Sequence, residues 1–449
     1  MKSLGVVASL LVLGAVAAEA QTSVTIYNDG RVLQRRTVPV RVPVGLSTHQ
    51  LMLGSFDLGS LFALDSGIAI MGASYDAAQD EANALRRSVG RQLAFATRGA
   101  NGVPETVSAE VMAVDPERYR LTDGRVTFQR PGVALFPPEL VPAQSSLVVG
   151  LKSDRARTSL GLGFFSGGAS WSADYDITLG KGTARVAGHA TIAIGTLRAD
   201  SVEVQLLAGT VGSAPKAQGF RREGIVTAAP MAMDAAGEQQ VGEAHLYTLP
   251  GRFALNPGVE TSAALFDPAN TPFERTFTVR GQLPYWGGLP QYGDEQAEPV
   301  SVTYLIKRVA KTEFGDRPVP GGTVRLYERD ASGRPQLVGE SSIGHTAAGQ
   351  DLRLDAGTAF DLTARRLQTT YETHSEAKRT VATATYTVTI ANAKDSAATV
   401  DVLEQRGGEW AVTSSSLPAE KVSSTITRFR VKVPAHGEAT LTYRVRVIW

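Results

Sequence analysis

Three side chains in one stretch of the chain are of the types that carry out acid and base chemistry: Glu340, His345 and Asp361. A carboxylate, an imidazole and a second carboxylate can serve as general acid and base, or bind a metal, when the fold brings them together. Asp361 follows His345 by sixteen residues, and the set matches no known metal signature. Gly339, Gly344 and Gly357 indicate tight backbone geometry in this stretch. The favoured interpretation is therefore that Glu340 and His345 hold a turn by hydrogen bonding and that Asp361 caps a loop.

Two neighbouring aromatic residues, Tyr285 and Trp286, are candidates for ligand binding. They stand between a proline and a pair of glycines, in a segment that is typical of a loop. Loop aromatics can present a surface to a glycan or peptide, although they often pin a loop to its own domain. Trp171 and Tyr175 lie four residues apart on the same face of an expected strand, and there core packing is the favoured role.

The residue types and spacing do not support disulfide bonding, covalent catalysis by cysteine or serine, or metal binding by histidine. The chain has no cysteine, which excludes a disulfide, a thiolate nucleophile and a cysteine-ligated zinc. The remaining histidines are scattered singly, without the spacing of a strand or helix chelate, and the serine-nucleophile motif Gly-x-Ser-x-Gly is absent. We therefore predict no cofactor and no metal, and we favour a role other than catalysis.

Charge and the first residues indicate where the protein works. The 449 residues include 45 basic and 44 acidic side chains, and this balance gives no electrostatic case for nucleic acid. A lysine, an apolar run and Ala18-Glu19-Ala20 form a secretory signal peptide over residues 1–20. No later window is long and apolar enough for an integral membrane span. We therefore expect a secreted protein of the periplasm or cell surface.

Strict alternation of apolar and polar residues dominates the chain after residue 20, most clearly over 386–390, 428–433 and 443–449. Such alternation is typical of strands with one buried face, as in two packed antiparallel sheets. One segment, Asp76–Leu93, instead has apolar residues at helical spacing, with Asp76 as the expected cap. We predict a mostly β fold of antiparallel, immunoglobulin-like β-sandwich units with an N-terminal β-unit and one short helix.

The expected domains follow from composition and strand spacing. They are an N-terminal β-rich domain with the short helix at 21–150, a first β-sandwich region at 151–300 and a C-terminal β-sandwich region at 301–449. Pro137, Pro138 and Pro142 fall close together and favour the first of these boundaries, because proline cannot donate a ladder hydrogen bond.

One ordered set of segments resembles a known family. The set comprises Val319–Tyr327, Gly339–Glu340, Ile343–Thr346 and Gly357–Asp361. These residues are similar to the exported bacterial proteins called domain of unknown function 4139, which are related to mucoidy-inhibitor-like proteins. Gly195 and Ala347 depart from the residues that the family pattern leads us to expect, and the long coiled-coil insertion of larger members is absent. The resemblance implies a secreted, β-rich fold and assigns no reaction.

The function we expect is therefore binding or scaffolding at the cell envelope, with a protein or glycan of the envelope as partner. Two alternatives remain open. An envelope hydrolase or metal-binding enzyme would use Glu340, His345 and Asp361. An outer-membrane-associated β protein would account for the alternating strand that ends at the aromatic residue Trp449.

Overall fold

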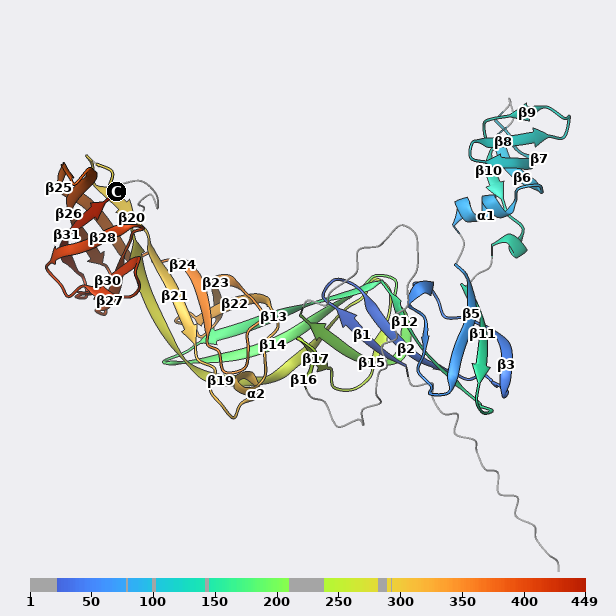
Figure 1. Ribbon diagram of the computed structural model, residues 1–449, viewed down its shortest axis with the longest axis horizontal. Coiled ribbons are helices and arrows are strands. Elements are labelled where there is room, and N and C mark those ends of the chain that lie inside the picture. The colour runs from blue at the N-terminus through green and yellow to red at the C-terminus, as the bar shows by residue number, and fades with distance from the viewer. Residues whose placement is uncertain are drawn as a thin grey trace, which may run out of the picture. The chain divides into compact units, whose positions relative to one another are not determined.

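The computed structural model describes residues 22–77, 80–98, 102–141, 145–209, 238–281, 289–291 and 293–449 (Figure 1). The predicted signal peptide and the aromatic pair Tyr285 and Trp286 lie outside the described residues. The fold is mostly β, as predicted, and in the described part α1 is the one helix of seven residues or more. No helix of this part is long and apolar enough to cross a membrane.

The chain forms two compact units, each made of several segments. Unit 1 comprises the described residues of Met1–Ser170, Ile194–Leu206 and Pro250–Val259. Unit 2 comprises those of Trp171–Ala193, Leu207–Leu249 and Glu260–Trp449. The expected boundaries at residues 150 and 300 fall inside or at the edge of strands, because strands distant in sequence pair with one another in both units.

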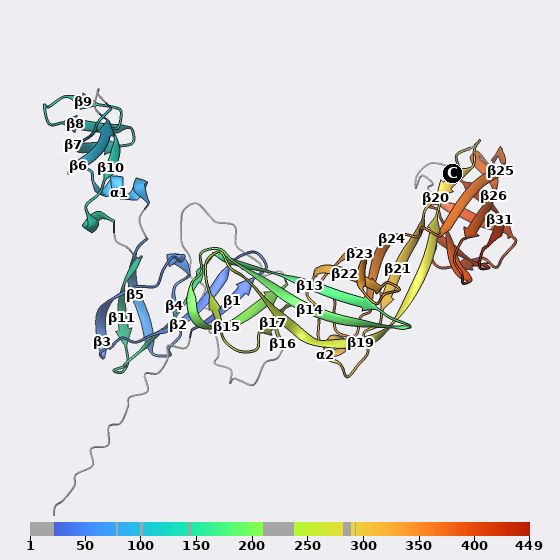
Figure 2. The same cartoon turned by 180° about the vertical axis from the view of Figure 1, so that it is seen from behind.

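The first sheet of unit 1 has the strand order β15-β1-β2-β12-β4, with β18 pairing to β15. Its strands are β1 (Ser23–Tyr27), β2 (Val32–Val38), β4 (Phe62–Ala63), β12 (Leu160–Ser166), β15 (Ala199–Ala208) and β18 (Phe253–Leu255). Strands β1, β2 and β15 lie side by side in both views, and Figure 1 also labels β12 beside them (Figure 1, Figure 2). Residues Asn28–Gly30 form the tight turn that joins β1 to β2, with Gly30 at φ +83°. Glycine tolerates this left-handed conformation at no steric cost.

A second sheet of unit 1 has the order β3-β11-β5. Its strands are β3 (Gly45–Leu51), β5 (Ile68–Asp76) and β11 (Ser146–Ser153). Alternate side chains of β11, namely Leu147, Val149 and Leu151, are fully buried in one core with Leu162 and Phe164 of β12. This core joins the two sheets. The short 3₁₀ turn η1 (Leu58–Ser60) precedes β4.

Between β5 and β11, the chain of unit 1 forms a small five-stranded sheet with the strand order β10-β6-β7-β8-β9. Its elements are α1 (Glu81–Arg87), β6 (Gln92–Arg98), β7 (Pro104–Val114), β8 (Glu117–Leu121), β9 (Val126–Thr127), β10 (Val133–Leu135) and the 3₁₀ turn η2 (Pro138–Leu140). Phe95 and Tyr119 are fully buried at its centre, with ring centroids 5.4 Å apart. Leu85 brings the buried face of α1 to the same cluster.

The helix is shorter than the predicted Asp76–Leu93. The side chain of Asp80, not Asp76, caps it by accepting a hydrogen bond from the Asn83 backbone at 2.7 Å. Gly90 has a φ of +81° and donates its N–H to Val111, which ends the helical region. Leu93 therefore belongs to β6, because pairing with β7 competes successfully with helix propensity there.

The main sheet of unit 2 has the order β23-β22-β13-β14-β19-β27-β30-β29, and β21 pairs with β19 and β24. Its strands are β13 (Ala169–Leu179), β14 (Thr183–Ile194), β19 (Glu260–Arg280), β21 (Val300–Ile306), β22 (Gly322–Arg329), β23 (Pro335–Ile343), β24 (Leu352–Thr358), β27 (Ala398–Gln405), β29 (Glu420–Lys421) and β30 (Ile426–Val433). Pairs β13–β22 and β19–β27 are parallel. The hairpin of β16 (Glu238–Val241) and β17 (Ala244–Thr248) and the single helical turn α2 (Glu313–Asp316) complete the region.

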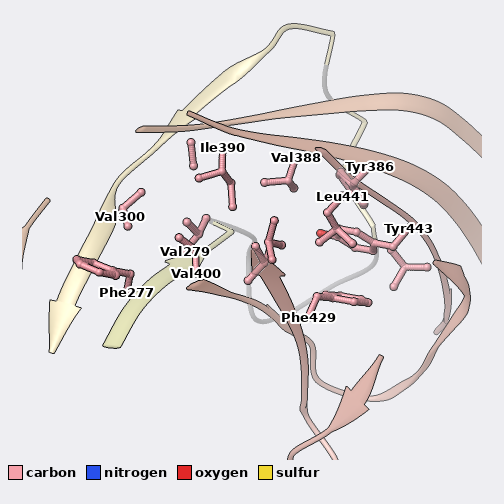
Figure 3. Packing of buried hydrophobic residues seen from close by; sticks show 14 of the residues in the cluster. Phe277, Val279, Val300, Tyr386, Val388, Ile390, Val400, Phe429, Leu441 and Tyr443 are labelled. Carbon is pink, nitrogen blue, oxygen red and sulfur yellow. The ribbon is translucent and has the colours of Figure 1, made fainter. Parts of the chain in front are cut away.

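A five-stranded sheet, β20-β25-β26-β31-β28, packs against part of the main sheet to form the C-terminal sandwich. Its strands are β20 (Gln296–Glu298), β25 (Leu362–Glu376), β26 (Arg379–Asn392), β28 (Glu409–Ser415) and β31 (Gly437–Ile448). Figure 3 shows Tyr386, Val388 and Leu441 from this sheet pointing toward Val400 and Phe429 from the other. The alternation in the sequence predicted β26 and β31 of this sheet, and their buried faces, correctly.

Candidate functional site

A buried arginine, Arg308, is 5% exposed and binds residues that flank the family-like segments, the four segments that carry the family resemblance. Its Nε donates to the Phe314 carbonyl at 2.7 Å, its Nη1 to Ala347 at 2.6 Å and its Nη2 to Arg317. The guanidinium also lies 5.2 Å from the ring centre of Phe314. Burial lowers the pKa of Arg308, and the three carbonyls compensate its charge. Arg308 therefore fixes the α2 turn against the segment that follows β23.

Two buried tyrosines hold the segment that leads into β22. Tyr175 of β13 donates its hydroxyl to the Pro320 carbonyl at 2.8 Å, and Tyr247 of β17 donates to Pro318 at 3.1 Å. Burial raises the pKa of both hydroxyls. The expectation that Tyr175 packs in a core is confirmed, since its side chain is fully buried.

The glycines of the same segment are needed for close backbone approach. A Cβ on Gly322 would overlap the carbonyl oxygen of Ala173, its partner in the parallel β13–β22 pairing. The backbone N–H of Gly321 donates to Nδ1 of His345 at 3.1 Å. The imidazole of His345 is thus an acceptor that holds a turn, which is the role favoured from the sequence.

The two candidate carboxylates have other partners. Glu340 of β23 lies directly opposite Arg325 of β22, and its Oε2 is 3.4 Å from Nε of Arg325. Asp361 precedes β25, and its Oδ2 is 3.4 Å from Nζ of Lys394. Each candidate residue therefore takes part in a different local interaction. Among the described residues, no group of three or more His, Cys, Asp or Glu side chains could hold a metal ion.

A buried charged network, which the sequence did not reveal, lies inside the C-terminal sandwich. Glu404 of β27 is fully buried; its Oε2 is 2.9 Å from Nη1 of Arg366, and its Oε1 is 2.8 Å from Nε of Arg406. The hydroxyl of Tyr443 donates to Oε2 of Glu404 at 2.7 Å, and Nε of Arg366 lies 3.2 Å from Glu298. This network links β20, β25 and β31 of one sheet to β27 of the other.

The network has a defined electrostatic state. Burial would raise the pKa of Glu404, but the two guanidinium groups of Arg366 and Arg406 outweigh burial and lower it. Glu404 is therefore ionised in the folded protein, between two cations. With Glu298 the network holds two positive and two negative groups, so its charges balance within the core.

A pocket of about 380 Å³ lies in unit 1, on the sheet of β2 and β15. We call it the basic pocket. Its lining combines apolar, hydroxyl and charged side chains: Thr22, Arg36, Thr37, Val38, Pro39, Met52, Leu53, Arg198, Ala199, Asp200, Ser201 and Arg252. Three arginines and one aspartate thus belong to the lining. Its volume lies within the usual range for small-molecule sites.

The elements around the pocket position each arginine. Arg36 lies on β2, where its Nε donates to Gln34 at 3.0 Å. Arg198 ends the turn before β15, whose backbone N–H groups at residues 195–197 all donate to the Gly168 carbonyl. Arg252 precedes β18 and donates from Nε and Nη2 to the hydroxyl and carbonyl of Ser201, both at 2.8 Å. The pocket is therefore built on paired strands and a hydrogen-bonded turn.

Neither site could be read directly from the sequence, because each combines residues from distant segments. The buried network did leave a signal: Glu404 continues the buried phase of Val400 and Val402, and Arg366 continues that of Leu362. A charged residue in the buried phase of a strand points to a paired partner inside the core.

Comparisons with known protein families and with curated proteins find no match to this chain.

Proposed function

We propose that this chain is an exported cell-envelope protein that binds or scaffolds a protein or glycan of the envelope, as a member of the family that its sequence resembles. The observation that supports binding most strongly is the chemistry of the basic pocket. Its lining offers hydrogen-bond donors, apolar surface and one carboxylate, Asp200, without an imidazole or a thiol. Such a lining is suited to holding a ligand, whereas acid–base catalysis most often depends on a histidine or a carboxylate with a raised pKa.

The interactions of the other candidates support the same proposal. Glu340, His345 and Asp361 each serve a local contact in unit 2. Tyr175 binds the carbonyl of Pro320 within the family-like segments, and Tyr247 and Arg308 bind carbonyls of residues that flank them. These segments are thus engaged in maintaining the fold, which leaves the basic pocket as the better place for a ligand.

Filling the basic pocket is expected to weaken ligand capture. Met52 lines the pocket and is 57% exposed, so Met52→Trp adds bulk there without disturbing a core. Mature protein carrying this change should recover less of its partner from envelope extracts, by about tenfold if one well-packed contact is lost. Recovery is measured by mass spectrometry of proteins and by glycan analysis.

The matched control is Met71→Trp, because Met71 of β5 is 61% exposed and does not line the pocket. This variant should recover the same partners as the unmodified protein. Equal recovery by the unmodified protein and by both variants would contradict a role of the pocket in binding.

A further inference from the structure

The arginines of the basic pocket have no carboxylate partner within the described part of the chain. Arg130, in comparison, pairs with Glu117 at 2.7 Å. By contrast, the guanidinium of Arg36 donates to the amide of Gln34, and that of Arg252 donates to Ser201. Among the described residues neither these two arginines nor Arg198 has a carboxylate within 4.0 Å.

Several donors of these arginines remain available to a ligand. Each guanidinium carries five N–H donors in a planar fork. Arg252 commits Nε and Nη2 to Ser201, which orients the group and leaves Nη1. Arg36 commits Nε alone, and its guanidinium carbon lies 5.9 Å from the ring centre of Phe164. Such forks match the geometry of carboxylate and phosphate oxygens.

The remainder of the lining selects a particular kind of anion. Val38, Pro39, Met52, Leu53 and Ala199 give the pocket an apolar wall beside its arginines. A bare inorganic anion would leave this wall in contact with water. An anion attached to an apolar body would use both the charge and the wall.

We propose, building on the proposed function, that the basic pocket recognises the carboxylate or phosphate group of an organic anion whose apolar part packs against Met52 and its neighbours. Arg198 and Arg252 supply the principal charge-assisted hydrogen bonds, because their side chains are exposed at the pocket. Asp200 in the same lining reduces the positive charge of the pocket but leaves it net positive. The free small anion and the headgroup of an anionic lipid share this chemistry.

Calorimetric titration of the mature protein tests the inference with three probes. Octyl phosphate carries head and tail, inorganic phosphate carries the head alone, and octyl glucoside carries the tail with a neutral head. Octyl phosphate should bind at least about tenfold more tightly than either of the others, since a charge-assisted hydrogen bond and a buried tail each contribute about tenfold. Raising the salt concentration should weaken its binding.

The variants Arg198→Gln and Arg252→Gln should each weaken octyl phosphate binding by about tenfold. The matched control is Arg185→Gln, because Arg185 of β14 is exposed and lies outside the pocket. The Arg185→Gln variant should bind octyl phosphate as tightly as the unmodified protein does. Equal binding of octyl phosphate by all three variants and the unmodified protein would overturn the inference.

Further outcomes separate this inference from the proposed function. Equally tight binding of octyl glucoside would overturn the preference for an anion while leaving the pocket as a binding site. Binding of none of the probes, with partner recovery unaffected by Met52→Trp, would overturn both. Binding to phosphatidylglycerol vesicles but not to phosphatidylcholine vesicles, lost in Arg198→Gln, would support the inference with a lipid headgroup as the source. Binding of soluble octyl phosphate alone would support it with a free anion as the source.

Discussion

Replacing Glu404 with alanine is expected to destabilise the C-terminal sandwich by about 3–5 kcal/mol, because the change leaves buried cations without their counter-charge. Arg366 and Arg406 are 4% and 3% exposed, so water cannot readily solvate the guanidinium groups that Glu404 now holds. The unfolding midpoint in urea should fall accordingly. Hydrogen exchange followed by mass spectrometry should locate the loss of protection in β25, β27 and β31.

The control for this prediction is Glu420→Ala. Glu420 lies 2.6 Å from Arg428, but it is exposed, so its loss should change the midpoint little. The variant Glu404→Gln keeps the shape of the side chain and removes its charge. Its unfolding midpoint should lie between those of Glu404→Ala and Glu420→Ala. Equal midpoints for Glu404→Ala and Glu420→Ala would show that the buried network does not support the sandwich.

The same network gives the stability a dependence on pH. Because Arg366 and Arg406 hold the pKa of Glu404 below its usual value of 4.5 despite burial, the folded state binds fewer protons there than the unfolded state in acid. The stabilisation from Glu404 is therefore complete above that usual value and is lost as the pH falls through the lower folded-state pKa. The loss should be weaker in Glu404→Gln, which has no such group to protonate.

Gly322→Ala is expected to destabilise unit 2 by about 3 kcal/mol, because a methyl group cannot be placed there without moving a strand. The added Cβ would overlap the carbonyl oxygen of Ala173, and both residues belong to the paired backbones of β22 and β13. A paired strand cannot yield as a flexible side chain can. The change should be measured as a lower unfolding temperature of the mature protein.

Gly344→Ala is the matched control, since both glycines belong to the family-like segments. No heavy atom lies within 4 Å of the position that a Cβ on Gly344 would occupy, and its φ is not in the left-handed region. This variant should unfold at nearly the same temperature as the unmodified protein. An equal loss of stability in both variants would mean that close packing of β22 on β13 is not the reason for glycine at position 322.

Strand phase was the part of the fold that the sequence predicted best. Alternation identified the buried side chains Tyr386, Val388 and Ile390 of β26, because apolar and polar residues alternate along a half-buried strand. The parallel β13–β22 pairing could not be predicted this way, because its residues Ala173 and Gly322 lie far apart in the chain. Periodicity within a segment contains no information about which distant segment will pair with it.

The sites were harder to predict for a related reason. His345 and Glu340 attracted attention because their types are chemically versatile, yet each makes a short-range contact, with Gly321 and Arg325 respectively. The arginines of the basic pocket are ordinary in sequence. Their significance comes from strand pairing and from turns that bring them together without carboxylate partners.

Two sets of residues in this chain have different expected roles. In unit 2, Arg308 and the buried tyrosines fix the backbone on either side of β22, and we propose that the basic pocket of unit 1 holds a ligand. This division agrees with a general property of protein folds, in which function depends on local sites and the same architecture serves many activities. It also makes the two sets of residues separable by mutation.

The most direct test of the central claim is one pull-down from envelope extracts that compares Met52→Trp with the triple variant Glu340→Gln, His345→Asn and Asp361→Asn. We predict that Met52→Trp recovers about tenfold less of the bound partner, whereas the triple variant recovers as much of it as the unmodified protein does. Loss of the partner from the triple variant together with full recovery by Met52→Trp would contradict the account and favour a site at Glu340, His345 and Asp361.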